Sequence, residues 1–144
     1  MFKNIVVGTD GSETATEAVR VAAELAALCG TELHVVSAYR KVPLRKLEQQ
    51  RASMPEEFAW EIYERAEVDA TLARAEKVAE IAGSTCVLHA SEEDPVPAIL
   101  DVSNKEGAEL IVVGNKGMER RLLSSVPNSV AHRAKTAVLI VATT

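Results

Sequence analysis

Residues 2–17 read FKNIVVGTDGSETATE, and this stretch decides the fold of the chain. A short, β-branched run over 2–8 ends in a glycine, which is typical of a buried strand that turns sharply. Ser12 or Thr14 can cap a helix, because alanines and other small apolar residues then recur at helical spacing. Gly30 is placed to end that helix. The stretch therefore predicts a buried strand followed directly by a helix.

The rest of the chain repeats this alternation. Further strands are expected over 32–39, 85–90, 110–114 and 137–142, and further helices over 55–82, 94–107 and 125–134. The polar, basic stretch 40–53 has no clear periodicity and is interpreted as a loop or lid. Strands that alternate with helices imply right-handed crossovers, so the sequence predicts an α/β fold with a doubly wound, parallel five-stranded sheet. With 144 residues and 47% hydrophobic content, one domain over 1–144 is expected.

Charge and hydropathy exclude several classes of partner. The chain carries 16 basic and 21 acidic residues, a net charge of -5, without a long Lys/Arg cluster, which argues against nucleic acid and anionic membranes. Its longest apolar runs have strand length, far below the roughly 20 residues of a membrane helix. The first residues lack the features of a signal peptide, so a cytoplasmic protein is expected.

Cysteines and histidines give no signal of a metal site. Cys29 and Cys86 show no C-x-x-C spacing, and they are interpreted as ordinary core residues. The histidines at 34, 89 and 132 are scattered and form no ligand pattern. No metal site is therefore predicted.

Two glycine-containing turns follow the first and fourth predicted strands: GTDGS at 8–12 and GNKG at 114–117. In a doubly wound sheet the ligand crevice opens at the carboxyl ends of the strands, where the direction of winding reverses. If the first and fourth strands are neighbours, both turns lie at one crevice. These turns, together with ELHVVSAY, SSVPNSV and the terminal VLIV, resemble the universal stress protein family over the whole chain.

The resemblance implies a Rossmann-like sheet in the order 3-2-1-4-5 with an adenine-nucleotide site at the crevice. Asp10 would accept hydrogen bonds from the ribose hydroxyls, although its carboxylate can equally cap the turn or the helix. Glycines in the second turn would let backbone N–H groups approach a phosphate, although a bend alone can require them. The backbone of Ala38 would face the adenine. By position, the implied site comprises Gly8, Thr9, Asp10, Ala38, Val113, Gly114, Asn115, Gly117, Ser124, Ser125 and Val126.

The phosphate end of this site departs from the family pattern. Six residues separate Gly117 from Ser124, three fewer than nine, which removes about 10 Å of extended chain. Ser124 also stands where the family places glycine. Arg120 and Arg121 lie in this short loop and can contact phosphate or point into solvent, as can Lys116. The implied ligand is ATP or another adenine nucleotide, with which Mg²⁺ can bind, and the short loop favours AMP or cyclic AMP.

Three functions are compatible with these residues. The leading hypothesis is a stress-response, nucleotide-binding regulatory module that acts as a homodimer through its C-terminal strand, Ala137 to Ala142. The alternative is an interaction protein of the same fold without nucleotide binding, and the third is a slow ATPase. No catalytic residue is predicted, because no nucleophile has a histidine placed to serve it.

Overall fold

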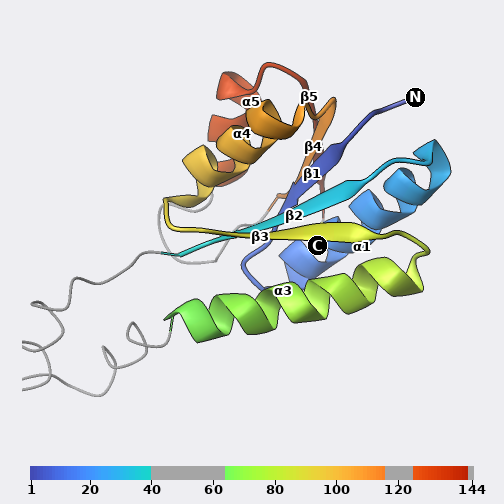
Figure 1. The fold of residues 1–144 in the computed structure, drawn as a ribbon. Helices are drawn as coiled ribbons and strands as arrows, with labels where there is room; N and C mark the ends of the chain where they lie inside the picture. Colours follow the sequence, from blue (N-terminus) through green and yellow to red (C-terminus); the bar gives the residue numbers. More distant parts are fainter. Residues whose placement is uncertain (40–63, 116–124, 143–144) are drawn as a thin grey trace, which may run out of the picture.

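Five parallel strands form the centre of the structure, a computed structural model that describes residues 1–39, 64–115 and 125–142 (Figure 1). The strands are β1 (Ile5–Gly8), β2 (Leu33–Ala38), β3 (Cys86–Ser91), β4 (Leu110–Gly114) and β5 (Ala137–Val141). They lie in the order β3-β2-β1-β4-β5, and every neighbouring pair is parallel. The predicted strand order is confirmed.

Helices cover both faces of the sheet. The helices α1 (Glu13–Cys29) and α3 (Glu64–Ile81) lie on one face, while α4 (Pro95–Glu106) and α5 (Ser125–Arg133) lie on the other (Figure 1). The doubly wound α/β class is thereby confirmed. No helix in the described part of the chain is long and apolar enough to cross a membrane.

The alternation of side chains along each strand divides the core into two halves. In β1, Ile5 and Val7 join the cluster under α1 and α3, while Val6 joins the cluster under α4 and α5. β4 divides in the same way, so the central strands are apolar in both directions. The edge strand β3 is only half-buried, and Cys86 at its start is no more than partly buried. The expectation that the cysteines are core residues is therefore too strong.

The first strand begins at Ile5, three residues later than predicted, because Asn4 breaks the extended backbone. Asn4 has a φ of 52°. Its N–H donates to Oγ1 of Thr31 at 2.8 Å, and its side-chain amide donates to the carbonyl of Glu106 at 2.9 Å. Asparagine tolerates this left-handed conformation better than most residues. Asn4 thus ties the start of β1 to the end of α4.

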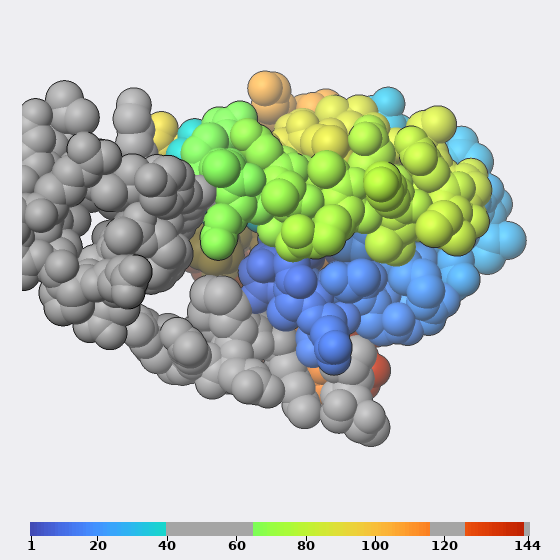
Figure 2. Space-filling model, turned by 90° about the horizontal axis from the view of Figure 1, so that it is seen from below, coloured from blue at the N-terminus to red at the C-terminus, as the bar shows by residue number. Residues whose placement is uncertain are grey.

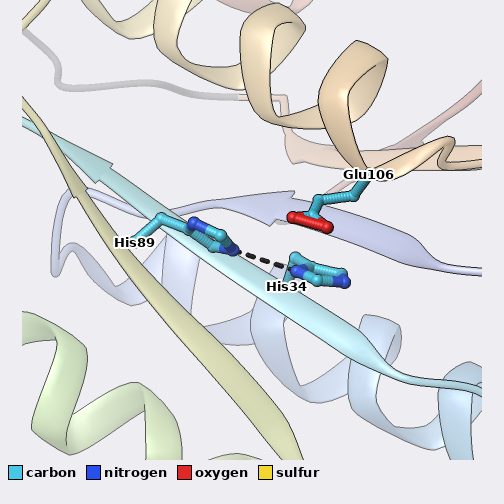
Figure 3. Close-up of side chains that lie close together, drawn as sticks. All are labelled: His34, His89 and Glu106. Carbon is cyan, nitrogen blue, oxygen red and sulfur yellow. Dashed lines mark hydrogen bonds between the residues drawn. The ribbon is translucent and has the colours of Figure 1, made fainter.

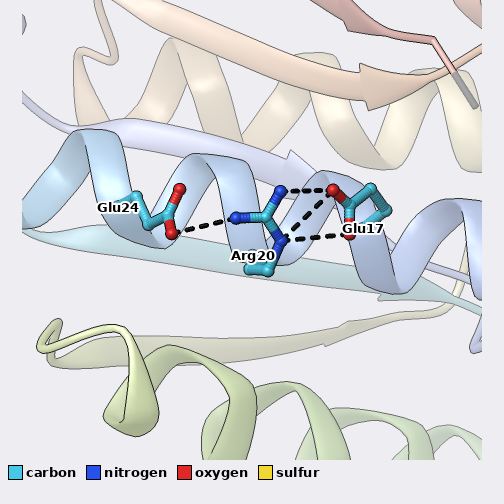
Figure 4. A network of polar contacts seen from close by, with 3 residues as sticks. All are labelled: Glu17, Arg20 and Glu24. Carbon is cyan, nitrogen blue, oxygen red and sulfur yellow. Dashed lines mark hydrogen bonds and ion pairs between the residues drawn. The ribbon is translucent and has the colours of Figure 1, made fainter.

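Helix α1 begins after Ser12, whose Oγ accepts a hydrogen bond from the N–H of Ala15 at 3.2 Å. Of the two caps that the sequence offered, Ser12 is the one observed. On the exposed side of the helix, Arg20 lies between Glu17 and Glu24 and bonds both carboxylates (Figure 4). These contacts lower the pKa of Glu17 and raise that of Arg20. Spacings of three and four residues place such pairs on one helix surface.

The remaining predicted elements are found with small differences in length. α3 confirms the later part of the helix expected over 55–82. The start of that prediction and the expected loop or lid at 40–53 lie outside the described residues. α4 has Asp94 as its N-cap residue, a proline in its first turn and Gly107 at its end, as the sequence predicted.

Candidate functional site

The carboxyl ends of β1 and β4 lie side by side in the middle of the sheet. Val7 is in register with Val112, and the two strands continue toward opposite faces, β1 into α1 and β4 toward α5. This is the point at which the direction of winding reverses, where open α/β sheets hold their ligands. The prediction that the first and fourth strands are neighbours is confirmed.

Hydrogen bonds within the loop after β1, and one to β2, fix the conformation of that loop. Thr9 is buried, and its N–H donates to the carbonyl of Val36 at 2.9 Å. Its Oγ1 accepts from the N–H of Gly11 at 3.1 Å, and Oδ1 of Asp10 accepts from the N–H of Ser12 at 2.9 Å. Such side-chain bonds to the backbone two residues ahead replace the backbone bonds of a regular turn. The loop is therefore fixed by its own side chains before any ligand binds.

Asp10 is exposed at the end of this loop. Because an ionised carboxylate has two oxygens and about four acceptor positions, the bond from Ser12 leaves it able to accept others. The turn-forming role that the sequence allowed is thus observed, and it does not compete with contact to a ligand.

Gly114, the last residue of β4, has a packing role in the structure. A Cβ at this position would lie 2.7 Å from Cγ2 of Thr14 and 3.2 Å from the Thr14 carbonyl oxygen. The missing side chain therefore lets the first turn of α1 approach the end of β4. The next residue, Asn115, donates its N–H to the carbonyl of Val141 at 2.9 Å, which extends the pairing with β5.

The structure brings together most of the residues implied by the resemblance. At the carboxyl edge of the sheet or directly after it lie Gly8, Thr9, Asp10, Ala38, Val113, Gly114 and Asn115, and at the start of α5 lie Ser125 and Val126. The side chain of Val113 is buried in the core under α4 and α5, so only its backbone faces the edge. Gly117 and Ser124 lie outside the described residues, as do Lys116, Arg120 and Arg121.

A hollow of about 160 Å³ lies beside the same loop, between α1 and α3. Figure 2 shows these two helices side by side on this face, α3 in green and α1 in blue. Thr9, Gly11 and Arg74 are among its lining residues, and Nη2 of Arg74 donates to Oγ1 of Thr71 at 3.3 Å. Sequence reasoning missed Arg74, because nothing along the chain connects the middle of a polar helix with the loop after the first strand.

A second polar group lies between β2, β3 and the end of α4 (Figure 3). Nδ1 of His34 on β2 and Nε2 of His89 on β3 are 2.9 Å apart, and the Glu106 carboxylate at the end of α4 lies over the two rings. One ligating atom of each residue lies within 4.8 Å of those of the other two. Burial, and then the neighbouring His34, lower the pKa of His89. No pattern along the chain predicted this group, because 55 positions separate the two histidines.

Comparison with known proteins shows which protein family this chain is similar to. The profile of the universal stress protein family matches residues 1–142. Universal stress protein Rv1636 of Mycobacterium tuberculosis is 38% identical over 152 aligned positions, which cover 99% of this chain and 98% of the relative.

Solved structures agree with this placement. A universal stress protein in complex with cAMP is 33% identical, with a TM-score of 0.73 over 97% of this chain and 96% of that one. The protein of Archaeoglobus fulgidus in complex with dAMP is 25% identical, with a TM-score of 0.69 over 96% of each chain. The family profile, the sequence relative and the two solved structures each cover nearly the whole chain, and this chain belongs to the universal stress protein family.

Proposed function

We propose that this protein is a regulatory module that binds an adenine nucleotide at the crevice between the carboxyl ends of β1 and β4. The observation that carries the proposal is the exposed carboxylate of Asp10. It is held by a loop with internal hydrogen bonds, at the point where the winding direction of the sheet reverses. Two similar proteins have structures in complex with cAMP and dAMP, which supports an adenine nucleotide as the ligand.

In this proposal each part of the crevice holds one part of the nucleotide. Asp10 accepts hydrogen bonds from the ribose hydroxyls, and the backbone of Ala38 at the end of β2 faces the adenine edge. The phosphate lies toward the first turn of α5, whose unpaired N–H groups and positive dipole end favour an anion. The short segment between Gly117 and Ser124 favours one phosphate group, as in AMP or cyclic AMP, over three.

The test is calorimetric titration of the full chain with AMP, cyclic AMP and ATP, using wild type and Asp10→Asn. Asparagine keeps an oxygen for the N–H of Ser12 and replaces the other, charged oxygen with an NH₂ group that donates hydrogen bonds. A hydrogen bond to a charged group contributes about 1.5–3 kcal/mol, so we expect binding to weaken roughly 10- to 100-fold.

Glu92→Gln is the matched control, because Glu92 is an exposed acid just beyond the end of β3, two strands away from Asp10. It should bind like wild type. Absence of heat with all three nucleotides would refute the proposal and favour an interaction protein without a nucleotide. Phosphate release measured in the same samples with Mg²⁺ tests for turnover, and we expect none above the protein-free blank.

We further propose that the module is a homodimer paired through β5. This strand forms one edge of the sheet, and Ile140 on it is 43% exposed. An edge strand presents N–H and C=O groups that a second copy can pair with, and a two-fold arrangement closes after two copies.

A further inference from the structure

We propose that His34, His89 and Glu106 form a binding site for a divalent transition-metal ion of the zinc class. The site lies between the start of β2, the inner part of β3 and the end of α4, and is separate from the nucleotide crevice (Figure 3). It joins three elements, since each ligand comes from a different one.

The donor types and their distances suit such an ion. Zinc binds imidazole nitrogen at about 2.0–2.1 Å and carboxylate oxygen at about 2.0–2.2 Å, which places neighbouring ligands of a tetrahedral site roughly 3.3 Å apart. The two histidine nitrogens are 2.9 Å apart, and all three ligating atoms lie within 4.8 Å of one another. Shifts of a few tenths of an ångström for the histidines, and more for the flexible glutamate, would close the site. Imidazole ligands select zinc, copper or nickel over magnesium and calcium.

The surroundings of His34 supply the outer support that metal-binding histidines need. His34 is 2% exposed, and its Nε2 lies 3.0 Å from Oε1 of Glu32. The angle is too poor for a hydrogen bond, so Nε2 has no hydrogen-bond partner among the residues that the structure describes. A histidine that binds metal through one nitrogen usually donates the other N–H to a carboxylate, a backbone carbonyl or water. With Nδ1 on the ion, a small rotation would aim the Nε2–H at Glu32.

The charges also balance around a divalent ion. Glu32 and Glu106 together carry two negative charges, and neutral imidazoles complete the set. The end of α4 adds its negative dipole end, which favours a cation. Lys105, the neighbouring positive charge, is exposed and free to turn into solvent.

The experiment uses the full chain after removal of any histidine tag. Zinc chloride is titrated calorimetrically into wild type, His89→Gln and Glu106→Gln, and Co²⁺ is added to follow the visible absorption of a four-coordinate ion. We expect both variants to bind zinc at least about 100-fold more weakly and to lose the Co²⁺ band. Glu32→Gln should weaken binding about tenfold, as the loss of an outer-shell partner does.

His132→Gln is the control, because His132 is an exposed histidine on α5 that is not part of this group. It should bind like wild type. His89 and Glu106 are only half-buried, so glutamine at either position should keep the fold, which circular dichroism checks.

Zinc should also raise the melting temperature of wild type and not that of the two ligand variants. Two results would overturn the proposal: wild type that binds zinc no better than His89→Gln, or binding that survives in both ligand variants and is lost in Cys86→Ser.

Discussion

Glycine is required at positions 11 and 114 beside the crevice for different physical reasons. Gly11 has a φ of 84°, and a Cβ there would lie 2.9 Å from Oγ1 of Thr71 and 3.1 Å from Nη2 of Arg74. Gly114 has no such φ, and its missing Cβ makes room for Thr14 on α1. The family pattern of glycines around the crevice is therefore explained in part by contacts between protein elements, without a ligand.

Gly11→Ala should destabilise the protein by more than the cost of its backbone angle. The left-handed conformation costs a non-glycine residue about 1–2 kcal/mol, and the contact with Thr71 adds to it. Gly83→Ala is the matched control, because Gly83 has a φ of 85° and nothing within 4 Å of its Cβ position. The free energy of unfolding in urea measures both variants. Equal losses would show that the contact with α3 costs nothing.

Glu93 and Asp101 should make stability fall as the pH rises. A hydrogen bond with Asp101 raises the pKa of Glu93 above its ordinary 4.5, against the opposing bond from Ser91. The folded state thus holds this proton more tightly than the unfolded state, so the contribution is complete below pH 4.5 and is lost as the pH rises through the raised pKa.

The variant Glu93→Gln offers Asp101 a hydrogen-bond donor, its side-chain N–H, at every pH. Its melting temperature should match that of wild type below pH 4.5 and exceed it at neutral pH, where two carboxylates otherwise repel each other. Glu92→Gln serves as the control beside it. A difference that does not grow with pH would contradict the pairing.

At the scale of elements, the position of a strand in the sheet decides how much of it is buried. β1, β2 and β4 are almost wholly buried, while β3 and β5 are half-buried at the edges. The carbonyl of Val141 faces β4, where it accepts from Asn115. Because backbone groups alternate along a strand, those of Val138 and Ile140 point to the open side.

Ile140→Pro should therefore abolish the proposed dimer without unfolding the protein, because it removes an N–H on the open side of β5. Leu139→Pro is the counterpart, since it removes an N–H that faces β4, and it should lower stability. Sedimentation velocity at several concentrations measures assembly, and circular dichroism checks the fold. An Ile140→Pro protein that remains dimeric would exclude β5 as the interface.

At the scale of the whole molecule, the sheet carries two separate polar groups. The crevice with Asp10 lies at the carboxyl ends of β1 and β4, and the group of His34, His89 and Glu106 lies between the start of β2, the inner part of β3 and the end of α4. α4 begins at Pro95, after the carboxyl end of β3, and ends at Glu106 in the second group. The two sites can therefore be changed independently, and the tests of nucleotide and zinc binding do not interfere.

The sequence predicted what depends on neighbours along the chain. The alternation of elements, the helix ends at Gly30 and Gly107 and the bounds of β4 were all predicted and are confirmed. The crevice followed from the fold, because parallel strands bring their carboxyl ends to one edge. The roles of individual residues there, apart from the observed turn at Asp10, stay predictions.

What the sequence could not predict depends on contacts across the sheet or between helices. The approach of His34 to His89 requires β2 and β3 to pair, and the place of Arg74 beside Gly11 requires α3 to pack on α1. Asn4 lies within the run of residues from which the first strand was predicted, but its hydrogen bond to Thr31 holds it outside that strand. No pattern of neighbouring residues contains these contacts.

The pairing of Ile5 with Leu110 can form only after a delay during synthesis. The central strand β1 is made first, and its partner β4 follows 105 positions later. At about 5–20 residues per second, a ribosome needs roughly 5–20 s to supply that partner. During this interval one side of β1 has no strand beside it, and the core around its valines is incomplete. The nascent chain therefore exposes apolar side chains and unpaired backbone groups of β1 until β4 is made and pairs with it.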